Sequence, residues 1–384
     1  MSQGRAIIVG AGIVGAACAR TLARDGWDVL VVDSRPIGSG ATAAGMGHIV
    51  AMDDSEAQLA LCRYSRDLWD ELAPKLPASV ESTRAGTLWV ASDEEEMAEV
   101  DRKARFFADR GVEAEAVGAD RLRQLEPNLR SGLLGGFRVP GDSVIYPPSA
   151  SAFLIERAQS QGARFELGPP IRAVSGHWVE RDDGSKLAGD LVVNAAGARA
   201  AHLTPGLAIR PRKGHLVITD RHPGFVHHQI LELGYLKSAH GSDHDSVAFN
   251  VQPRATGQLL IGSSRQYDVT DPAVEPHMLR RMIDQALRFL PGLAHLSAVR
   301  AWTGFRAATP DSLPIIGPHP EVPGLFLAAG HEGLGITTSL GTAELLADLI
   351  ADRPSAISTE PYSPSRFSHG WNTDGTLMKS VISL

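Results

Sequence analysis

The chain has 384 residues, of which 43% are hydrophobic and 21% charged, and its net charge is −7. This length suits two domains of ordinary size, and the acidic balance, with no stripe of Lys and Arg, argues against nucleic acid as a partner. No apolar stretch reaches the roughly 18 to 20 residues of a membrane span, and the glycine-broken N-terminal run does not have the form of a signal peptide. We therefore expect a cytoplasmic protein; peripheral contact with the inner membrane through an electron acceptor is the alternative.

The only two cysteines are Cys18 and Cys62. An iron–sulfur cluster takes about four thiolates, and two cysteines make no disulfide framework. We expect no metal site in this chain, so any such cluster would belong to another subunit.

Residues 5–33 read RAIIVGAGIVGAACARTLARDGWDVLVVD. Gly10, Gly12 and Gly15 follow an apolar run with G-x-G-x-x-G spacing, and a second apolar run ends at Asp33. This context predicts a βαβ nucleotide cradle, in which the glycines allow a tight turn and a close approach to pyrophosphate while the acid faces the ribose. The cradle alone does not distinguish NAD from FAD.

The next segment, SRPIGSGATAAGMGHIVAMDD, is rich in small residues that can pack on a flat ligand. Thr42 and its neighbouring amides are placed to reach pyrophosphate or a ring carbonyl. His48 follows on an extended segment. Either it faces a substrate, or the loop merely crosses under the sheet.

Between this loop and residue 139 the pattern predicts helices and strands that interrupt the nucleotide domain. Ser55 is the expected N-cap of the first helix. The expected elements are helices at 54–76, 93–110 and 120–126 and strands at 86–92 and 133–139.

A helix at 147–162 then leads to strands at 164–167 and 171–174 and to a hairpin through 182–184. Residues 190–196 form a continuous apolar run typical of a buried parallel strand. The small residues Ala195, Ala196 and Gly197 after it suit a backbone that passes close to a dinucleotide.

Residues 209–265 contain several alternating runs, and a helix at 277–289 follows them. We expect an antiparallel sheet that covers the active site, with Tyr235 and Asn250 facing the substrate. Near the C-terminus, the strand 324–330 ends in a Gly-rich turn, and a helix at 337–350 directs its N-terminal N–H groups at a ligand. Such a helix end would suit a flavin ring that becomes anionic on reduction.

Three motifs together resemble the FAD-dependent D-amino acid oxidase superfamily, which includes glycine oxidase, sarcosine oxidase and D-amino acid dehydrogenase. They are the cradle, the loop GATAAGMGHIV, and the segment WTGFRAATPDSLPIIG followed by AAGHEGLGIT. The resemblance extends to about Phe367. It implies an α/β fold with a discontinuous Rossmann-type FAD-binding domain and an inserted α+β substrate domain built on an antiparallel sheet. The expected boundaries are 1–76, 140–208 and 305–366 for the FAD domain, 77–139 and 209–304 for the substrate domain, and 367–384 for a C-terminal tail.

The resemblance also implies which residues contact FAD. They are Gly10, Gly12, Ile13, Val14, Gly15, Asp33, Ser34, Arg35, Ser39, Ala41, Thr42, Ala44, Gly45, Met46, Val174, Ala195, Ala196, Gly197, Gly304, Arg306, Gly330, Gly333, Leu334, Gly335, Ile336 and Thr337. Asp33 stands where the family usually has Glu. Gly333 stands where glycine oxidase has a second arginine, which departs from the glycine oxidase pattern.

Arg306 matches the arginine that clamps the substrate carboxylate in glycine oxidase-like members; the alternative is an ion pair with Asp311. Hydride leaves the α-carbon for flavin N5 only when the amine is neutral, and His48, His331 and Glu332 are the candidates to favour that form. For His331 the alternative is a cap at the helix start.

Within the superfamily, the 45–74 run and the GHEGLGITTS turn are most similar to the β subunits of heteromeric amino acid dehydrogenases, above all that of D-hydroxyproline dehydrogenase. This implies oxidation of a small, cyclic amino acid to an imine, with electrons passed to a quinone or to partner subunits that carry a second flavin or an iron–sulfur cluster. The alternatives are an oxygen-using oxidase that makes hydrogen peroxide and a flavin-binding relay or scaffold subunit of an opine or cyanide-forming complex.

Overall fold

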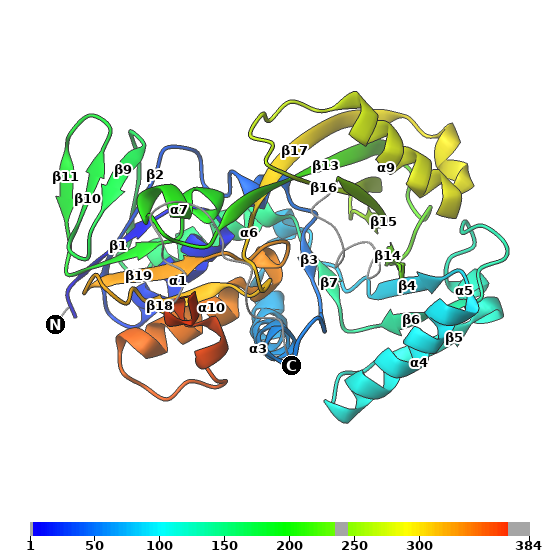
Figure 1. Ribbon diagram of the computed structural model, residues 1–384, viewed down its shortest axis with the longest axis horizontal. Coiled ribbons are helices and arrows are strands. Elements are labelled where there is room, and N and C mark those ends of the chain that lie inside the picture. The colour runs from blue at the N-terminus through cyan, green and yellow to red at the C-terminus, as the bar shows by residue number, and fades with distance from the viewer. Residues whose placement is uncertain (1–2, 235–244, 368–384) are drawn as a thin grey trace.

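The computed structural model describes residues 3–234 and 245–367. Tyr235 and residues 368–384 of the expected tail lie outside this part of the chain. The fold is mixed α/β with two large sheets, and Figure 1 shows them at opposite ends of the molecule.

The first large sheet has six strands in the order β18-β19-β12-β1-β2-β8. Its neighbours are parallel except for the β18–β19 pair. The continuous apolar runs of the sequence form these strands because both faces of the sheet are covered. Their bounds are β1 Arg5–Val9, β2 Asp28–Asp33, β8 Arg164–Leu167, β12 Leu191–Asn194, β18 Ile315–Pro318 and β19 Leu325–Ala329.

Alternate residues of β1 point to opposite faces of the six-stranded sheet, and both faces are covered. Ala6 and Ile8 join the core formed with the helices, whereas Ile7 and Val9 pack with residues of a small antiparallel sheet. The helices are α1 Ile13–Arg24, α3 Glu56–Leu72, α6 Pro147–Gln159 and α10 Gly335–Ile350. The small sheet consists of β9 Ile171–Val174, β10 Trp178–Arg181 and β11 Lys186–Ala188.

The second large sheet has eight strands in the order β17-β13-β16-β15-β14-β4-β6-β5. The antiparallel sheet expected from the sequence is present, but it contains one parallel pair, β4 with β14. The bounds are β4 Thr87–Ala91, β5 Glu115–Gly118, β6 Gly135–Val139, β13 Arg210–Arg221, β14 Gln229–Glu232, β15 Ser246–Pro253, β16 Gln258–Tyr267 and β17 Ala298–Ala308.

Helix α9, Pro276–Phe289, covers one face of this sheet, and its Phe289 stacks on Phe249 of β15 with ring centroids 4.6 Å apart. The other α-helices among residues 3–234 and 245–367 are α2 Ala41–Ala44, α4 Glu94–Asp109, α5 Ala119–Leu125 and α7 Ala200–Leu203. A two-stranded sheet of β3 His48–Ile49 and β7 Ser143–Val144 lies between the two large sheets (Figure 1).

Local sequence signals predicted the bounds of most elements to within a few residues. Ser55 caps α3 as expected, since its side chain accepts the Gln58 N–H. Helix α3 ends at Leu72, four residues before the expected end, because Pro74 follows in a 3₁₀ turn. Strand β17 runs through position 305, where we expected a domain boundary, and the domain boundaries stay a prediction.

No helix in the described part of the chain is both long and apolar enough to cross a lipid bilayer.

Candidate functional site

The glycine cradle after β1 has the close packing that its motif predicts. Gly10 has φ +110°, and a Cβ there would lie 2.5 Å from the Ala195 carbonyl oxygen. A Cβ on Gly15 would lie 2.0 Å from the Gly10 carbonyl oxygen. Only glycine fits both positions, so the N-terminus of α1 comes close to the end of β12 and presents its N–H groups there.

Two side chains hold the cradle in shape. The Asp33 carboxylate accepts the N–H of Ala11 through Oδ2 at 2.8 Å and that of Arg35 through Oδ1 at 3.0 Å. The Thr42 hydroxyl accepts the N–H of Ile13, the first residue of α1, at 3.0 Å. Each carboxylate oxygen keeps a further lone pair, so Asp33 can still accept a ribose hydroxyl.

The last residue of α2 and the loop after it lie against the face of the eight-stranded sheet that α9 leaves open. A Cβ on Gly304 of β17 would lie 2.3 Å from Ala44 Cβ, and one on Gly262 of β16 would lie 3.2 Å from Met46 Sδ. Gln252 of β15 donates to the Met46 carbonyl oxygen at 2.7 Å. These contacts bring the expected flavin loop onto strands β15, β16 and β17.

Four buried polar side-chain atoms near Met46 have no hydrogen-bond partner among the described residues. They are His48 Nε2, Asn250 Oδ1, Gln252 Oε1 and Trp302 Nε1. Buried polar groups are rarely left unpaired. A flavin ring carries both donors and acceptors on its edge. The amide oxygens of Asn250 and Gln252 can accept hydrogen bonds from it and the Trp302 indole can donate one, so these atoms and the glycine cradle fit FAD.

Arg306 lies on this same sheet face. Its Nη1 donates to the Ser264 carbonyl oxygen at 3.1 Å and would meet a Cβ on Gly214 at 2.3 Å, so the guanidinium crosses β13 where that strand has no side chain. Asp311, the alternative partner, instead pairs with Arg366 at 2.7 Å.

Glu332 precedes α10 and lies beside Arg306. It has φ +51°, and its N–H donates to the Ala307 carbonyl oxygen at 2.9 Å. Its carboxylate forms an ion pair with Arg212 of β13. Arg212 and Arg306 are register partners on neighbouring antiparallel strands.

The two candidate histidines differ in their surroundings. Burial lowers the pKa of His48 to about 4, a shift that Gln252 partly opposes. Burial lowers the pKa of His331 to about 3, and its Nε2 lies 3.0 Å from the Thr342 hydroxyl within α10. His331 therefore has a structural partner in the helix, whereas His48 Nε2 is one of the four unpaired atoms.

The other residues expected to contact FAD lie on the cradle, on loop 34–46, at the end of β12, in the turn before α10 or in the first turn of α10. The exception is Val174, which lies on β9 and packs against the hydrophobic cluster that includes Ile7 and Val9 of β1. Helix α10 begins at Gly335, two residues before the expected start. Direct contact of these residues with FAD stays a prediction.

Arg212, Gly214, Gln252, Gly262 and Trp302 face the site but were not identified from the sequence. Gly214 and Gly262 carried a usable signal, since a glycine inside a strand often marks a close approach of another group. Arg212, Gln252 and Trp302 carried none, because their positions depend on the pairing of distant strands.

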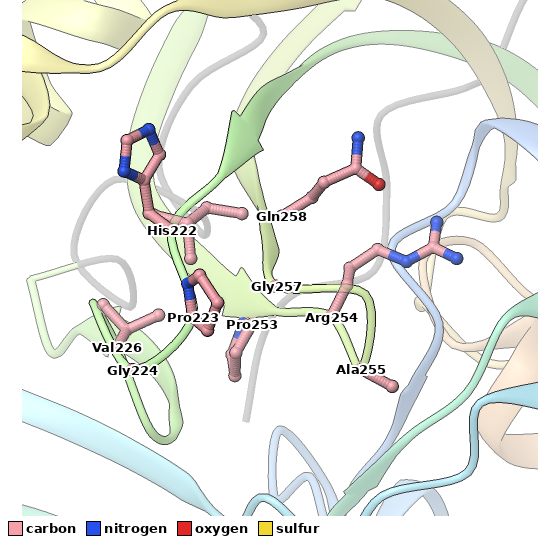
Figure 2. A pocket seen from close by; sticks show the side chains of 10 residues that line it. His222, Pro223, Gly224, Val226, Pro253, Arg254, Ala255, Gly257 and Gln258 are labelled. Carbon is pink, nitrogen blue, oxygen red and sulfur yellow. The ribbon is translucent and has the colours of Figure 1, made fainter.

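A separate surface pocket of about 240 Å³ lies at the turns 222–226 and 253–259 and contains none of the expected site residues. In Figure 2 the side chains of His222 and Arg254 extend to opposite sides of it. Arg254 is held by an ion pair with Glu81 at 2.6 Å.

The comparisons with known proteins agree with this arrangement. The family model described as FAD dependent oxidoreductase (DAO) matches residues 5–349. Glycine oxidase of Geobacillus kaustophilus is 29% identical over 374 residues, covering 94% of this chain and 96% of the relative. Hydrogen cyanide synthase subunit HcnC of Pseudomonas aeruginosa is 26% identical, covering 94% and 95%.

Among solved structures, L-proline dehydrogenase from P. horikoshii superposes with a TM-score of 0.84 at 25% identity, covering 96% of this chain and 99% of that one. The match of the family model over nearly the whole chain, together with the cradle and the fold, shows that this protein belongs to the DAO family of FAD-dependent oxidoreductases.

Proposed function

We propose that the protein oxidises a small cyclic amino acid of the D-hydroxyproline or proline type to an imine and passes the electrons to a partner subunit or a quinone. The observation that carries this proposal is the position of Arg306, which lies across Gly214 on the sheet face that meets the flavin loop. The likeness to L-proline dehydrogenase over 96% of the chain supports the choice of substrate type.

FAD, when bound, would accept the hydride of the substrate α-carbon at its N5 atom. The cradle at 10–15, Asp33, the loop 42–46 and the N-terminus of α10 would hold it. The unpaired atoms of His48, Asn250, Gln252 and Trp302 would line the remaining space.

The protein's own side chains would bind and orient the substrate. Arg306 can hold the carboxylate through two parallel hydrogen bonds, which fixes the position of the α-carbon. His48 is uncharged at neutral pH because burial lowers its pKa to about 4. Its Nε2 can therefore accept a hydrogen bond from the amine without repelling a positive charge.

An anaerobic visible spectrum of the FAD-loaded protein tests the proposal. cis-4-Hydroxy-D-proline, D-proline, L-proline and sarcosine are added in turn, and air follows. We expect one of the cyclic compounds to bleach the flavin band, with slow recovery in air. If none of the four bleaches it, the proline-type assignment is wrong.

The glycine oxidase relative favours a second candidate, an oxidase that uses oxygen. In the same experiment it would show rapid recovery in air with release of hydrogen peroxide.

The HcnC relative is named as a subunit of hydrogen cyanide synthase, and it favours a third candidate, a relay or scaffold subunit. Arg306→Lys separates this candidate from the others. A carboxylate clamp should lose substrate affinity by about 100-fold while FAD stays bound, because Lys cannot make the two parallel hydrogen bonds. Arg123→Lys, an exposed change on α5, is the control. A relay subunit would be indifferent to both changes.

A further inference from the structure

We propose that the ion pair between Arg212 and Glu332 makes the site select substrates with one carboxylate over substrates with two. The inference rests on the proposed function, because it takes Arg306 as the group that binds the substrate carboxylate. It adds the chemical class of substrate that the site accepts.

Arg212 lies on the same sheet face as Arg306. The two are direct register partners on β13 and β17, which run side by side (Figure 1). Side chains at such opposed positions share one face, with Cβ atoms about 4.5 to 5.5 Å apart. Arg212 also donates to the Tyr267 hydroxyl of β16 at 3.2 Å. A second guanidinium therefore borders the place where Arg306 would hold a carboxylate.

Glu332 reaches this place from the turn before α10. Its backbone N–H donates a hydrogen bond to the carbonyl oxygen of Ala307, the residue after Arg306. A Cβ on Gly333, the residue after Glu332, would lie 3.9 Å from Arg306 Cδ. The side chains of Arg212 and Glu332 are only 12% and 13% exposed. The pair is thus a fixed part of the site's border.

The charges of these three groups determine what fits. Arg306, Arg212 and Glu332 sum to one positive charge, which matches one carboxylate. A second carboxylate on the substrate would need Arg212 as its partner. Arg212 already pairs with Glu332, whose carboxylate would repel the second carboxylate of the substrate. Such interactions are strong where solvent is largely excluded.

Glu332→Gln tests this by raising the local charge by one unit and releasing Arg212. The FAD-loaded protein is titrated with acetate, which has one carboxylate, and with malonate, which has two. Binding is followed by the change in flavin absorption and by calorimetry. We expect malonate to bind at least about tenfold more tightly in Glu332→Gln than in the natural protein, with a smaller change for acetate.

Two variants serve as controls. Arg212→Gln combined with Glu332→Gln restores the charge and should lose the gain for malonate. Glu81→Gln is matched to Glu332→Gln, since Glu81 also has φ +51° and pairs with an arginine, and its side chain is 19% exposed. Glu81 pairs with Arg254 of the separate pocket, so its replacement should leave the ratio of the two affinities unchanged.

The same titrations of the natural protein test the inference even if no variant folds. Tighter binding of malonate than of acetate to the natural protein would overturn it. If Glu332→Gln does not fold, Arg212→Gln decides. Its remaining Glu332 charge should weaken acetate binding by about tenfold, and unchanged binding contradicts the role of the pair.

Failure of the inference can be told from failure of the proposed function. If acetate binding depends on Arg306 but Glu332→Gln gains nothing for malonate, only the role of the ion pair is wrong. If acetate does not bind, or Arg306→Lys leaves its affinity unchanged, the carboxylate clamp itself is wrong.

Discussion

The hydroxyl of Thr337 donates to the carbonyl oxygen of His48 at 2.9 Å and accepts the N–H of Val50 at 3.3 Å. These contacts join the first turn of α10 to strand β3 across 289 positions of sequence. The helix N-terminus and the buried imidazole are therefore held at a fixed separation, although each belongs to a different end of the chain.

Replacing Thr337 with Val should loosen this junction, because the Val50 N–H and the His48 carbonyl lose a buried partner while the side-chain volume is kept. We expect a loss of about 2 kcal/mol in the free energy of unfolding and weaker retention of FAD. Urea unfolding and the flavin content after dialysis measure both. Thr338→Val is the control, since the Thr338 hydroxyl donates to the carbonyl oxygen of Leu334, the N-cap of the same helix. Equal losses in the two variants would contradict the linking role.

Gly214→Ala should displace the Arg306 guanidinium, because the new methyl group would lie 2.3 Å from its Nη1. We expect KM for the substrate to rise by about tenfold or more, with FAD content unchanged. Steady-state kinetics and the flavin spectrum measure this. Gly118→Ala is the control, since a Cβ at Gly118 has no neighbour within 4 Å. An unchanged KM in Gly214→Ala would mean that Arg306 does not hold the substrate in this position.

Lys103 of α4 and Asp53 of the loop after β3 form a buried ion pair, with side chains 3% and 4% exposed. Lys103→Met should cost about 3 kcal/mol of stability, because it leaves the Asp53 carboxylate buried with only the distant Arg102, at 3.9 Å, as a counter-charge. Adding Asp53→Leu should recover most of that loss. Chemical denaturation of the natural protein and both variants measures the effect. A double variant no more stable than Lys103→Met would contradict this account.

His331 should make stability depend on pH. Its pKa is about 3 in the fold against an ordinary value of 6.5. Between these values the unfolded chain binds a proton that the native protein does not, so the free energy of unfolding rises with pH from about 3 to 6.5.

His331→Asn keeps a partner for Thr342 but does not titrate in this range. It should lower the slope of stability against pH by up to about 1.4 kcal/mol per pH unit. Urea unfolding at several pH values between 4 and 6.5 measures the slope, with the exposed His295→Asn as control. Equal slopes for the natural protein and His331→Asn would show that His331 is protonated in the fold.

Features that depend on neighbouring residues were predictable from the sequence. The cradle glycines, the Ser55 cap and the apolar strands each follow from local sterics or periodicity, and the structure has them all. The C-terminal motif likewise identified Arg306 and Glu332, which the structure brings together.

Features that depend on strand register were not predictable. Arg212 lies 94 positions before Arg306, and nothing in either segment indicates that they are opposed. The parallel pairing of β4 with β14 joins segments more than 130 residues apart, so the sequence offered only separate strands. The unpaired atoms of Gln252 and Trp302 face the site only because these strands pair as they do.

Gly214 and Gly304 lie opposite each other, and the space beside them admits no side chain. This requirement disfavours any other register of β13 with β17. If the register of β17 shifted by one residue, Arg306 would point to the face covered by α9. The side chain of Phe305 or Thr303 would then face Ala44 in place of Gly304, which has no side chain. A misaligned strand would thus bury a charge and crowd the flavin loop in the same step. Correct alignment of one edge strand is therefore a precondition for forming the oxidation site, and chains that fold with the strand misaligned should fail to take up cofactor as well as substrate.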